Sequence, residues 1–516
     1  MQRIARYTYT LLLGAALGLT SCDKDFEELN TNPNASTEPN VDMLFSQSIL
    51  KGNYVYDRVY FYTSYLTCGN YIQHFATGKE ITVAGSGDKY GVYDFYQGFY
   101  FRYTYTNVLT TITELIKAAD KQPELVNKKA AARIWRVMIM QRITDLYGDV
   151  PFTDANKATS DLNFFPKYDP QGEIYDGLLR ELESAIASFS DTQVKYGKAD
   201  FIYEGSIPKW KKFGYSLMLR LAMRMTKIAP EKAREWATKA IAGGVITTEV
   251  DQAVIKYTNG PQTYNDNPVA FELVGQEYQP GFNGDRNTEY GKYSKTFIDF
   301  LQTRNDPRLP VVAVVWNGAN ADTSSAVQKG MPNGTNGKPA NFVTFSEPNP
   351  ATILQYSAPL IALSAAEMNF LLSEAILRGW ATGNAADAYR TGIEISMRNW
   401  ALFGAGGVIA PAKINAYTTA NALNTGGTFD AQMNQIHSQF WVASLLDEQE
   451  AYANWRRTGY PQLTPVNFPG NATGGTIPRR LPYPVQEQGI NKRNYDAAIA
   501  RQGADLLTTR VWWDKQ

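Results

Sequence analysis

The feature that most constrains the fold is a recurring pattern of apolar residues spaced three and four positions apart. Residues 128–147 show it clearly, with Ile134 and Met138 on one face, as expected of an amphipathic helix. Gly148 and Pro151 follow this stretch, and both residue types are typical of a helix end. The other stretches with this pattern are 173–189, 209–228, 231–242, 362–378, 385–402 and 430–457, and a weaker one begins at Val41.

These predicted helices occur in pairs along the chain. The pairs are 128–147 with 173–189, 209–228 with 231–242, and 362–378 with 385–402. Helix pairs stacked side by side are the repeating unit of tetratricopeptide-like solenoids. The spacing between the pairs is irregular, which indicates degenerate repeats. We therefore predict a mostly all-α fold with a tetratricopeptide-like scaffold of helix pairs.

One region interrupts the helical pattern. Residues 245–360 are rich in Gly, Asn and Pro and contain one short β-like run, Val311–Trp316. Long loops in a compact domain are usually functional, so we expect these loops to pack against the helices and to carry the ligand site. The predicted organisation is a single domain over residues 41–516 with this loop-rich insert.

The first 21 residues have the features of a bacterial lipoprotein signal. Arg3 and Arg6 precede an apolar run over residues 11–19, which is too short to span a bilayer but has the length of a signal-peptide core. A small residue and then Cys22 follow, in an order that resembles a lipobox, at which the signal is cleaved and the cysteine is lipidated. We predict a signal peptide over residues 1–21 and lipid attachment at Cys22. The alternative is an ordinary secretory signal with an incidental cysteine.

An acidic and polar tether is predicted over residues 22–40. Four acids occur within residues 23–28, and the Pro- and Asn-rich stretch after them has no period. Acids beside the lipid resemble the export signal of surface lipoproteins in Bacteroidetes, with plain solvation as the alternative. We expect the chain to be lipid-anchored in the outer membrane and to face the extracellular side.

The composition argues against several classes of function. Loss of residues 1–21 removes Arg3 and Arg6 and no acid, so the formal charge falls from 0 to −2, and no nucleic-acid partner is expected. After Cys22 only Cys68 remains, so we predict no intrachain disulfide and a buried thiol. The two histidines, His74 and His437, cannot form a histidine cluster for a metal.

We predict no cofactor and no metal. A calcium site at Asn283-Gly284-Asp285 is the alternative, but the surrounding residues lack the alternating oxygen ligands of an EF-hand.

Six passages, in chain order, resemble the SusD/RagB family. They are RITDLYGDVP at 142–151, WKKFG continuing to LRLA at 210–222, RNDPRL at 304–309, SAAE leading to SEA at 364–375, EAYANWRRTGYP at 450–461 and RRLPYP at 479–484. The resemblance implies a helical lipoprotein on the outer face of the outer membrane. Such a protein captures a nutrient, usually an oligosaccharide, acts as a lid on a SusC-like TonB-dependent transporter, and has no catalytic residues.

Ligand-binding residues are expected where aromatic rings and polar side chains occur together. Sugars present flat apolar faces with hydroxyls around the rim, so a site needs stacked rings and hydrogen-bonding side chains. The stretches 90–97 and 278–317 supply both, and the same rings would also serve a peptide. The candidates are Tyr93, Asp94, Tyr96, Gln97, Tyr278, Tyr290, Trp316 and Asn317. Core packing is the alternative for any one of these rings.

Two other functions stay open at this point. A glycoside hydrolase needs two carboxylates facing a groove, and Glu272, Glu277, Asp285 and Glu289 lie near one another in the loop-rich region. We expect them to be solvated loop acids. The paired helices could instead form a protein-binding scaffold in the periplasm.

Several arginines are predicted to be structural. Arg456 and Arg457 belong to one of the six passages, Arg479 and Arg480 to another, and the segment 306–308 to a third. We expect them to form ion pairs and carbonyl hydrogen bonds that lock loops to helices.

Overall fold

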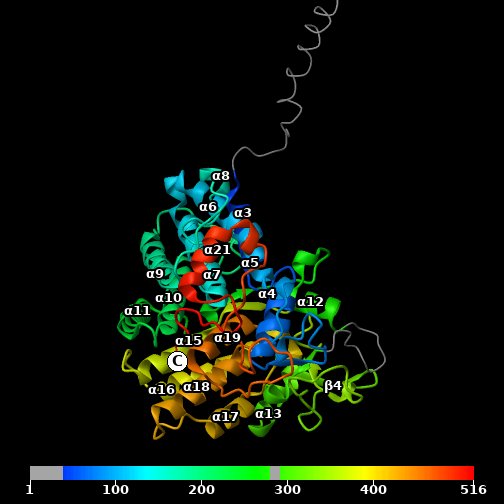
Figure 1. Ribbon diagram of the computed structural model, residues 1–516. Helices are drawn as coiled ribbons and strands as arrows, with labels where there is room; N and C mark the ends of the chain where they lie inside the picture. Colours follow the sequence, from blue (N-terminus) through cyan, green and yellow to red (C-terminus); the bar gives the residue numbers. More distant parts are fainter. Residues whose placement is uncertain (1–38, 279–290, 516) are drawn as a thin grey trace, which may run out of the picture. The chain divides into compact units, whose positions relative to one another are not determined.

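Helices form the framework of the computed structural model, which describes residues 39–278 and 291–515 (Figure 1). The longer helices are α3 (Val41–Gly52), α6 (Leu109–Asp120), α7 (Val126–Tyr147), α9 (Gln171–Ser188), α10 (Ile207–Arg224), α11 (Pro230–Gly243), α12 (Pro268–Gln276), α13 (Lys295–Thr303), α15 (Ala365–Leu377), α16 (Ala385–Arg398), α17 (Pro411–Ala420), α18 (Phe429–Ala443), α19 (Glu448–Thr458) and α21 (Lys492–Gln502). The short helices are α4 (Asp94–Gln97), α5 (Phe99–Tyr103), α8 (Ala158–Asp161), α14 (Leu309–Val312) and α20 (Glu487–Ile490), with π-helical segments η1 (Tyr60–Gly69) and η3 (Thr104–Val108).

The described residues also form seven short strands. They are β1 (Phe75–Thr77), β2 (Ala253–Ile255), β3 (Gly291–Tyr293), β4 (Ala313–Asn317), β5 (Asn320–Asp322), β6 (Glu347–Pro348) and β7 (Leu360–Leu363). Strand β1 pairs with β3, β2 pairs with β7, and β4 lies between β5 and β6, all antiparallel. The described elements belong to one unit, Val41–Gln516. The predicted signal peptide, Cys22 and most of the tether fall outside the described residues.

The predicted helix pairs are confirmed. Helix α7 packs on α9, α10 on α11, and α15 on α16. Local sequence explains several boundaries: Gly148 adopts φ +83° after α7, and the Asn384 side chain accepts a hydrogen bond from the Ala386 N–H at the start of α16. The predicted fold class, mostly all-α with tetratricopeptide-like helix pairs, is therefore correct.

Helix α7 differs from the expected amphipathic helix. Every residue from Val137 to Tyr147 is buried, including Arg142 and Asp145. Arg142 forms two hydrogen bonds of 2.8 and 2.7 Å with Asp447, and Asp145 accepts a hydrogen bond from the indole N–H of Trp513. Because buried partners satisfy these charged groups, the polar positions of the helix do not mark a solvent face.

The stretch 430–457 divides into two helices. Leu446 adopts φ +79° between α18 and α19, a conformation that an interior helical residue does not take. Asp447 then caps α19, because its side chain accepts a hydrogen bond of 3.2 Å from the Glu450 N–H.

The loop-rich region 245–360 contains more regular structure than its composition predicts. It holds α12, α13, α14 and strands β2 to β6. The β-like run Val311–Trp316 is a strand only from Ala313, since Val311 and Val312 close α14.

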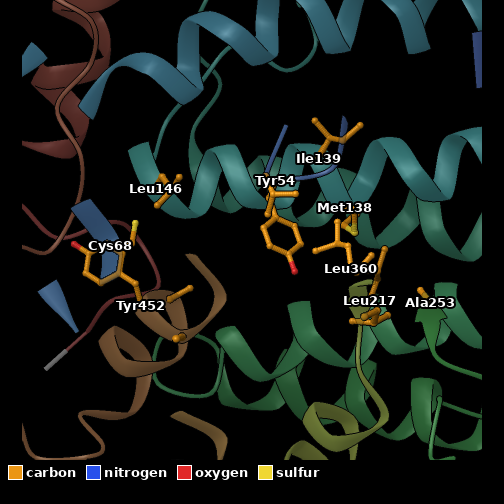
Figure 2. Close-up of a cluster of buried hydrophobic side chains, with 14 of the residues drawn as sticks. Tyr54, Cys68, Met138, Ile139, Leu146, Leu217, Ala253, Leu360 and Tyr452 are labelled. Atoms are coloured by element: carbon orange, nitrogen blue, oxygen red, sulfur yellow. The ribbon is translucent and has the colours of Figure 1, made fainter. Parts of the chain in front are cut away.

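A continuous apolar core joins the helices. Figure 2 shows Met138, Ile139 and Leu146 along α7, with Tyr54 beside that helix and Cys68 next to Tyr452. Cys68 is buried as predicted, and burial raises the pKa of its thiol.

The structural role predicted for the arginines is confirmed. Arg457 donates to both carboxylate oxygens of Glu374 at 2.8 and 2.7 Å, and the other contacts are ion pairs or a hydrogen bond to a backbone carbonyl. They are Arg456 with the Arg479 carbonyl, Arg479 with Asp514, Arg480 with Asp505, and Arg308 with Asp306. Each of these arginines, except the partly exposed Arg479, is buried. The Arg456 contact holds the loop at Arg479 against α19, as predicted, whereas Arg457 joins two helices, α19 and α15.

Candidate functional site

A pocket of about 280 Å³ brings together two of the predicted ligand residues, Tyr278 and Trp316. It lies between the end of α12, strand β4 and the segment after β6. Asn259, Glu347 and Tyr356 also line it. The pocket therefore combines aromatic rings with amide and carboxylate groups, as binding sites for small polar ligands do.

Strand pairing and a side-chain hydrogen bond fix the orientation of the Trp316 indole. Trp316 lies on β4 opposite Ala321 of β5, and its N–H donates a hydrogen bond of 2.8 Å to Oε2 of Glu347 on β6. The other oxygen of Glu347 accepts from the Lys292 ammonium of β3. Lys292 and Glu347 are only 1% and 3% exposed, so a buried ion pair sets the orientation of the half-buried ring.

Tyr278 contributes to the interior side of the pocket. Its side chain is buried, shares a hydrogen bond of 2.7 Å with the hydroxyl of Tyr65, and donates to the Gly291 carbonyl at 3.2 Å. Burial raises the pKa of both Tyr65 and Tyr278 well above the ordinary value. Both hydroxyls are therefore neutral at physiological pH.

The open side of the pocket is polar. Asn259 and Gln355 are exposed, and Tyr356 is half-buried. Amide groups both donate and accept hydrogen bonds, and the rings of Trp316 and Tyr356 offer flat apolar surfaces. This combination suits a ligand with an apolar face and a rim of hydroxyl groups.

Glu347 is the one carboxylate among the described residues that line this pocket. The two-carboxylate arrangement of a glycoside hydrolase is thus not formed by those residues. The prediction of solvated acids nearby is wrong for Glu272 and Glu277, which are both buried. Burial raises the pKa of Glu272, with Arg58 opposing the change, and Glu277 accepts a hydrogen bond of 2.6 Å from the Gly291 N–H. These carboxylates are buried because α12 packs on η1.

Within the other predicted stretch, 90–97, residues 94–97 form the single turn of α4 instead of a loop. Gln97 is buried and donates hydrogen bonds of 2.9 Å to the Tyr71 hydroxyl and the Gly91 carbonyl. The Tyr93 hydroxyl is hydrogen-bonded to Ser86 at 2.6 Å. Both side chains hold the local backbone together.

The other two candidates on α4 are Asp94 and Tyr96. Asp94 accepts a hydrogen bond of 2.7 Å from the Val485 N–H and pairs with Arg102 at 3.3 Å. Tyr96 is half-buried and stacks on Tyr62 of η1, with ring centroids 4.4 Å apart and 21° between the planes.

Segment η1 connects the two predicted stretches. The Tyr65 ring, which bonds Tyr278, stacks on Phe61 at 5.9 Å, and Phe61 contacts Tyr62 at 5.7 Å. Tyr62 then stacks on Tyr96. The two stretches are therefore joined by a row of rings, but α4 does not line the Trp316 pocket.

The last two predicted ligand residues are Asn317 and Tyr290. Asn317 is exposed at the end of β4, where it pairs with Asn320. Tyr290 lies outside the described residues, as do Asp285, Glu289 and the calcium alternative at 283–285.

The sequence-based selection missed Tyr356, Glu347 and η1. Tyr356 lies beside Gln355 in the loop-rich region and met the same ring-plus-amide criterion that selected Tyr93 to Gln97. Glu347 carries no such signal, because only the pairing of β4 with β6 brings it to Trp316.

Within residues 39–278 and 291–515, no group of three His, Cys, Asp or Glu side chains is placed to hold a metal ion. None of the helices in the described part of the chain combines the length and the apolar character needed to cross a bilayer.

Comparison with known proteins gives consistent relatives. A family model, SusD-like, described as starch-binding associating with outer membrane, matches residues 33–484. The solved structure of a chitin-binding protein is 30% identical, with a TM-score of 0.78 over 92% of this chain and 100% of that one. A Bacteroidetes SusD-like protein is 25% identical, with a TM-score of 0.79 over 93% and 100% of the two chains. A SusD homologue from Bacteroides uniformis is also 25% identical, with a TM-score of 0.76 over 93% and 100%. None of the curated proteins matches this chain.

Proposed function

Because the chain belongs to the SusD-like family of starch-binding proteins that associate with the outer membrane, we propose that it binds a glycan at the cell surface and delivers it to a SusC-like TonB-dependent transporter. The observation that carries this proposal is the Trp316 pocket, where the Lys292–Glu347 ion pair orients an aromatic ring beside Tyr356 and exposed amides. Neutral sugars need this combination, whereas a charged substrate would need unpaired charges in the pocket.

The proposed ligand is a neutral oligosaccharide. A similar structure at 30% identity is that of a chitin-binding protein, and the family description names starch. The first ligands to test are therefore an oligomer of N-acetylglucosamine and a malto-oligosaccharide, with a peptide as the competing class.

Replacing Trp316 with alanine should weaken glycan binding at this pocket by at least about tenfold, because aromatic anchors carry much of the energy of an interface. Titration calorimetry with chitohexaose and maltohexaose measures this effect. The Trp236→Ala variant is the control, since Trp236 is half-buried on α11 and lies outside the pocket. An unchanged affinity in Trp316→Ala, or binding of peptides and of neither sugar, would contradict the proposal.

The location and the partner form a separate part of the proposal. We place a lipid on Cys22 after removal of residues 1–21, with the body outside the cell, and the delivery role requires contact with the transporter. Purification of the full chain from native membranes in mild detergent should recover both an acylated Cys22 and a TonB-dependent transporter by mass spectrometry. Recovery of a non-acylated chain without any transporter would count against this part and leave glycan binding untouched.

A further inference from the structure

We propose a second carbohydrate-binding site in a pocket of about 420 Å³ at the start of α9, bordered by α11, α21 and the C-terminal segment. Its aromatic surface is Trp512, and Glu173, Lys232, Arg501 and Arg510 line its rim. In Figure 1, α9 and α11 lie on the opposite side of the view from α12 and β4, which border the Trp316 pocket.

Trp512 is placed as a flat binding surface. One side of the indole lies against Gly172, where an added Cβ would come within 3.1 Å of the ring, and Tyr175 packs at 5.7 Å between ring centroids. The ring is only half-buried. No described residue accepts a hydrogen bond from its N–H, so this donor is left for a ligand.

The adjacent tryptophan, Trp513, does not share the partial exposure of Trp512. Trp513 is fully buried and donates to Asp145 at 3.0 Å. Trp512 and Trp513 are the two central residues of a turn, which is closed by a hydrogen bond of 3.0 Å from the Asp514 N–H to the Val511 carbonyl. Trp513 enters the core from this turn, whereas Trp512 lines the pocket.

The rim supplies planar donors and a carboxylate acceptor. Glu173 is exposed and has no ion-pair or hydrogen-bond partner among the described residues. Arg510 uses Nη1 for Asp514 at 2.7 Å, and Arg501 uses Nε for Asp149 at 3.1 Å and Nη2 for the Tyr168 carbonyl. Further N–H groups of both guanidinium ions remain, and they have fixed, planar geometry.

The charge balance of the pocket favours a neutral ligand. Its three acids are Asp149, Glu173 and Asp176, and its three bases are Lys232, Arg501 and Arg510. Lys232 is already paired with Asp176 at 2.7 Å. A phosphate or a carboxylate ligand would meet acids as well as bases, whereas a sugar ring can stack on Trp512 and offer hydroxyls to both kinds of group.

This inference rests on the proposed function for the class of ligand but not for the location. A trisaccharide is a suitable probe, because it is short enough to occupy one pocket at a time. We would titrate the full-length protein with triacetylchitotriose and with maltotriose. At least one of these sugars should bind at two sites per chain, and Trp316→Ala should retain one of them.

In the Trp316→Ala background, Trp512→Ala should weaken the remaining binding by at least about tenfold. Glu173→Ala, a surface change, should weaken it several-fold. Trp236→Ala should leave it unchanged. Circular dichroism of each variant checks folding, and Glu173→Ala keeps the test valid should Trp512→Ala fail to fold.

The possible results separate the two proposals. One site that Trp316→Ala abolishes would overturn the second site and support the proposed function. Residual binding that is insensitive to both Trp512→Ala and Glu173→Ala would also overturn the second site. Displacement of the residual sugar by tri-alanine at equal concentration would overturn its assignment to carbohydrate. Absence of binding by either sugar would overturn both proposals.

Discussion

Replacing Glu450 with alanine should lower the free energy of unfolding by about 3–5 kcal/mol. Glu450 lies on α19 and is only 2% exposed. It accepts a hydrogen bond from Arg224 and lies 3.5 Å from Nε of Arg220, and both arginines are fully buried. The substitution would leave two buried cations with less counter-charge, which costs more than the loss of the contacts themselves.

The remaining partners limit this loss but do not cancel it. Arg220 also donates to both oxygens of Glu367 on α15 at 2.7 and 2.6 Å. Arg224 lies 3.3 Å from Asp145 on α7. The network thus joins α7, α10, α15 and α19. We therefore expect the variant to unfold in one cooperative transition, without prior local unfolding of a single helix.

Urea unfolding followed by circular dichroism measures this effect. The matched control is Glu183→Ala, which breaks the Lys239–Glu183 ion pair. That pair also has a short N···O distance, 2.7 Å, but both of its side chains are exposed. The control should cost less than about 1 kcal/mol. Similar losses in the two variants, at an unchanged slope against urea, would contradict a special role for the buried network.

Trp513→Ala should also destabilise the protein by about 3–5 kcal/mol, because it leaves a cavity in the core. The side chain is fully buried, and the guanidinium groups of Arg224 and Arg456 lie 5.8 and 4.8 Å from its ring centroid. Removal of the ring also takes one donor from the buried carboxylate of Asp145.

Trp512→Ala is the control for this prediction, since it removes the same side chain from the adjacent position. We expect a loss of only about 1 kcal/mol, because the ring is half-buried and stays partly in contact with solvent. Thermal and urea unfolding of both variants test the difference. Equal losses would show that Trp512 is part of the core and would weaken the case for the second pocket.

The sequence alone was sufficient to predict helices whose apolar pattern and capping residues lie within or next to the helix itself. Helices α9 and α16 carry regular apolar faces, and α16 is capped by Asn384. These features act within one or two turns, so they can be recognised without knowledge of the rest of the chain. Helix α21 was not predicted, because its only buried residues are Tyr495 and Ala498, and these two give almost no apolar pattern.

For the candidate site, the sequence identified the kind of residue but not its surroundings. It selected Tyr278 and Trp316 by composition, and these two residues line one pocket. It did not predict that Gln97 would be buried or that Glu347 and Lys292 would orient Trp316. Those contacts join residues that are far apart in the chain.

The sequence by itself determined the helix pairs, their caps and the supply of aromatic residues, because periodicity and capping depend on near neighbours. Tertiary structure alone decided that the C-terminal half of α7 is buried on all sides, that Arg220 and Arg224 share Glu450, and that Trp512 faces a pocket while Trp513 lies in the core. The physical reason is that burial of a charged or aromatic group depends on which distant side chains satisfy it. That pairing arises only when the helices pack.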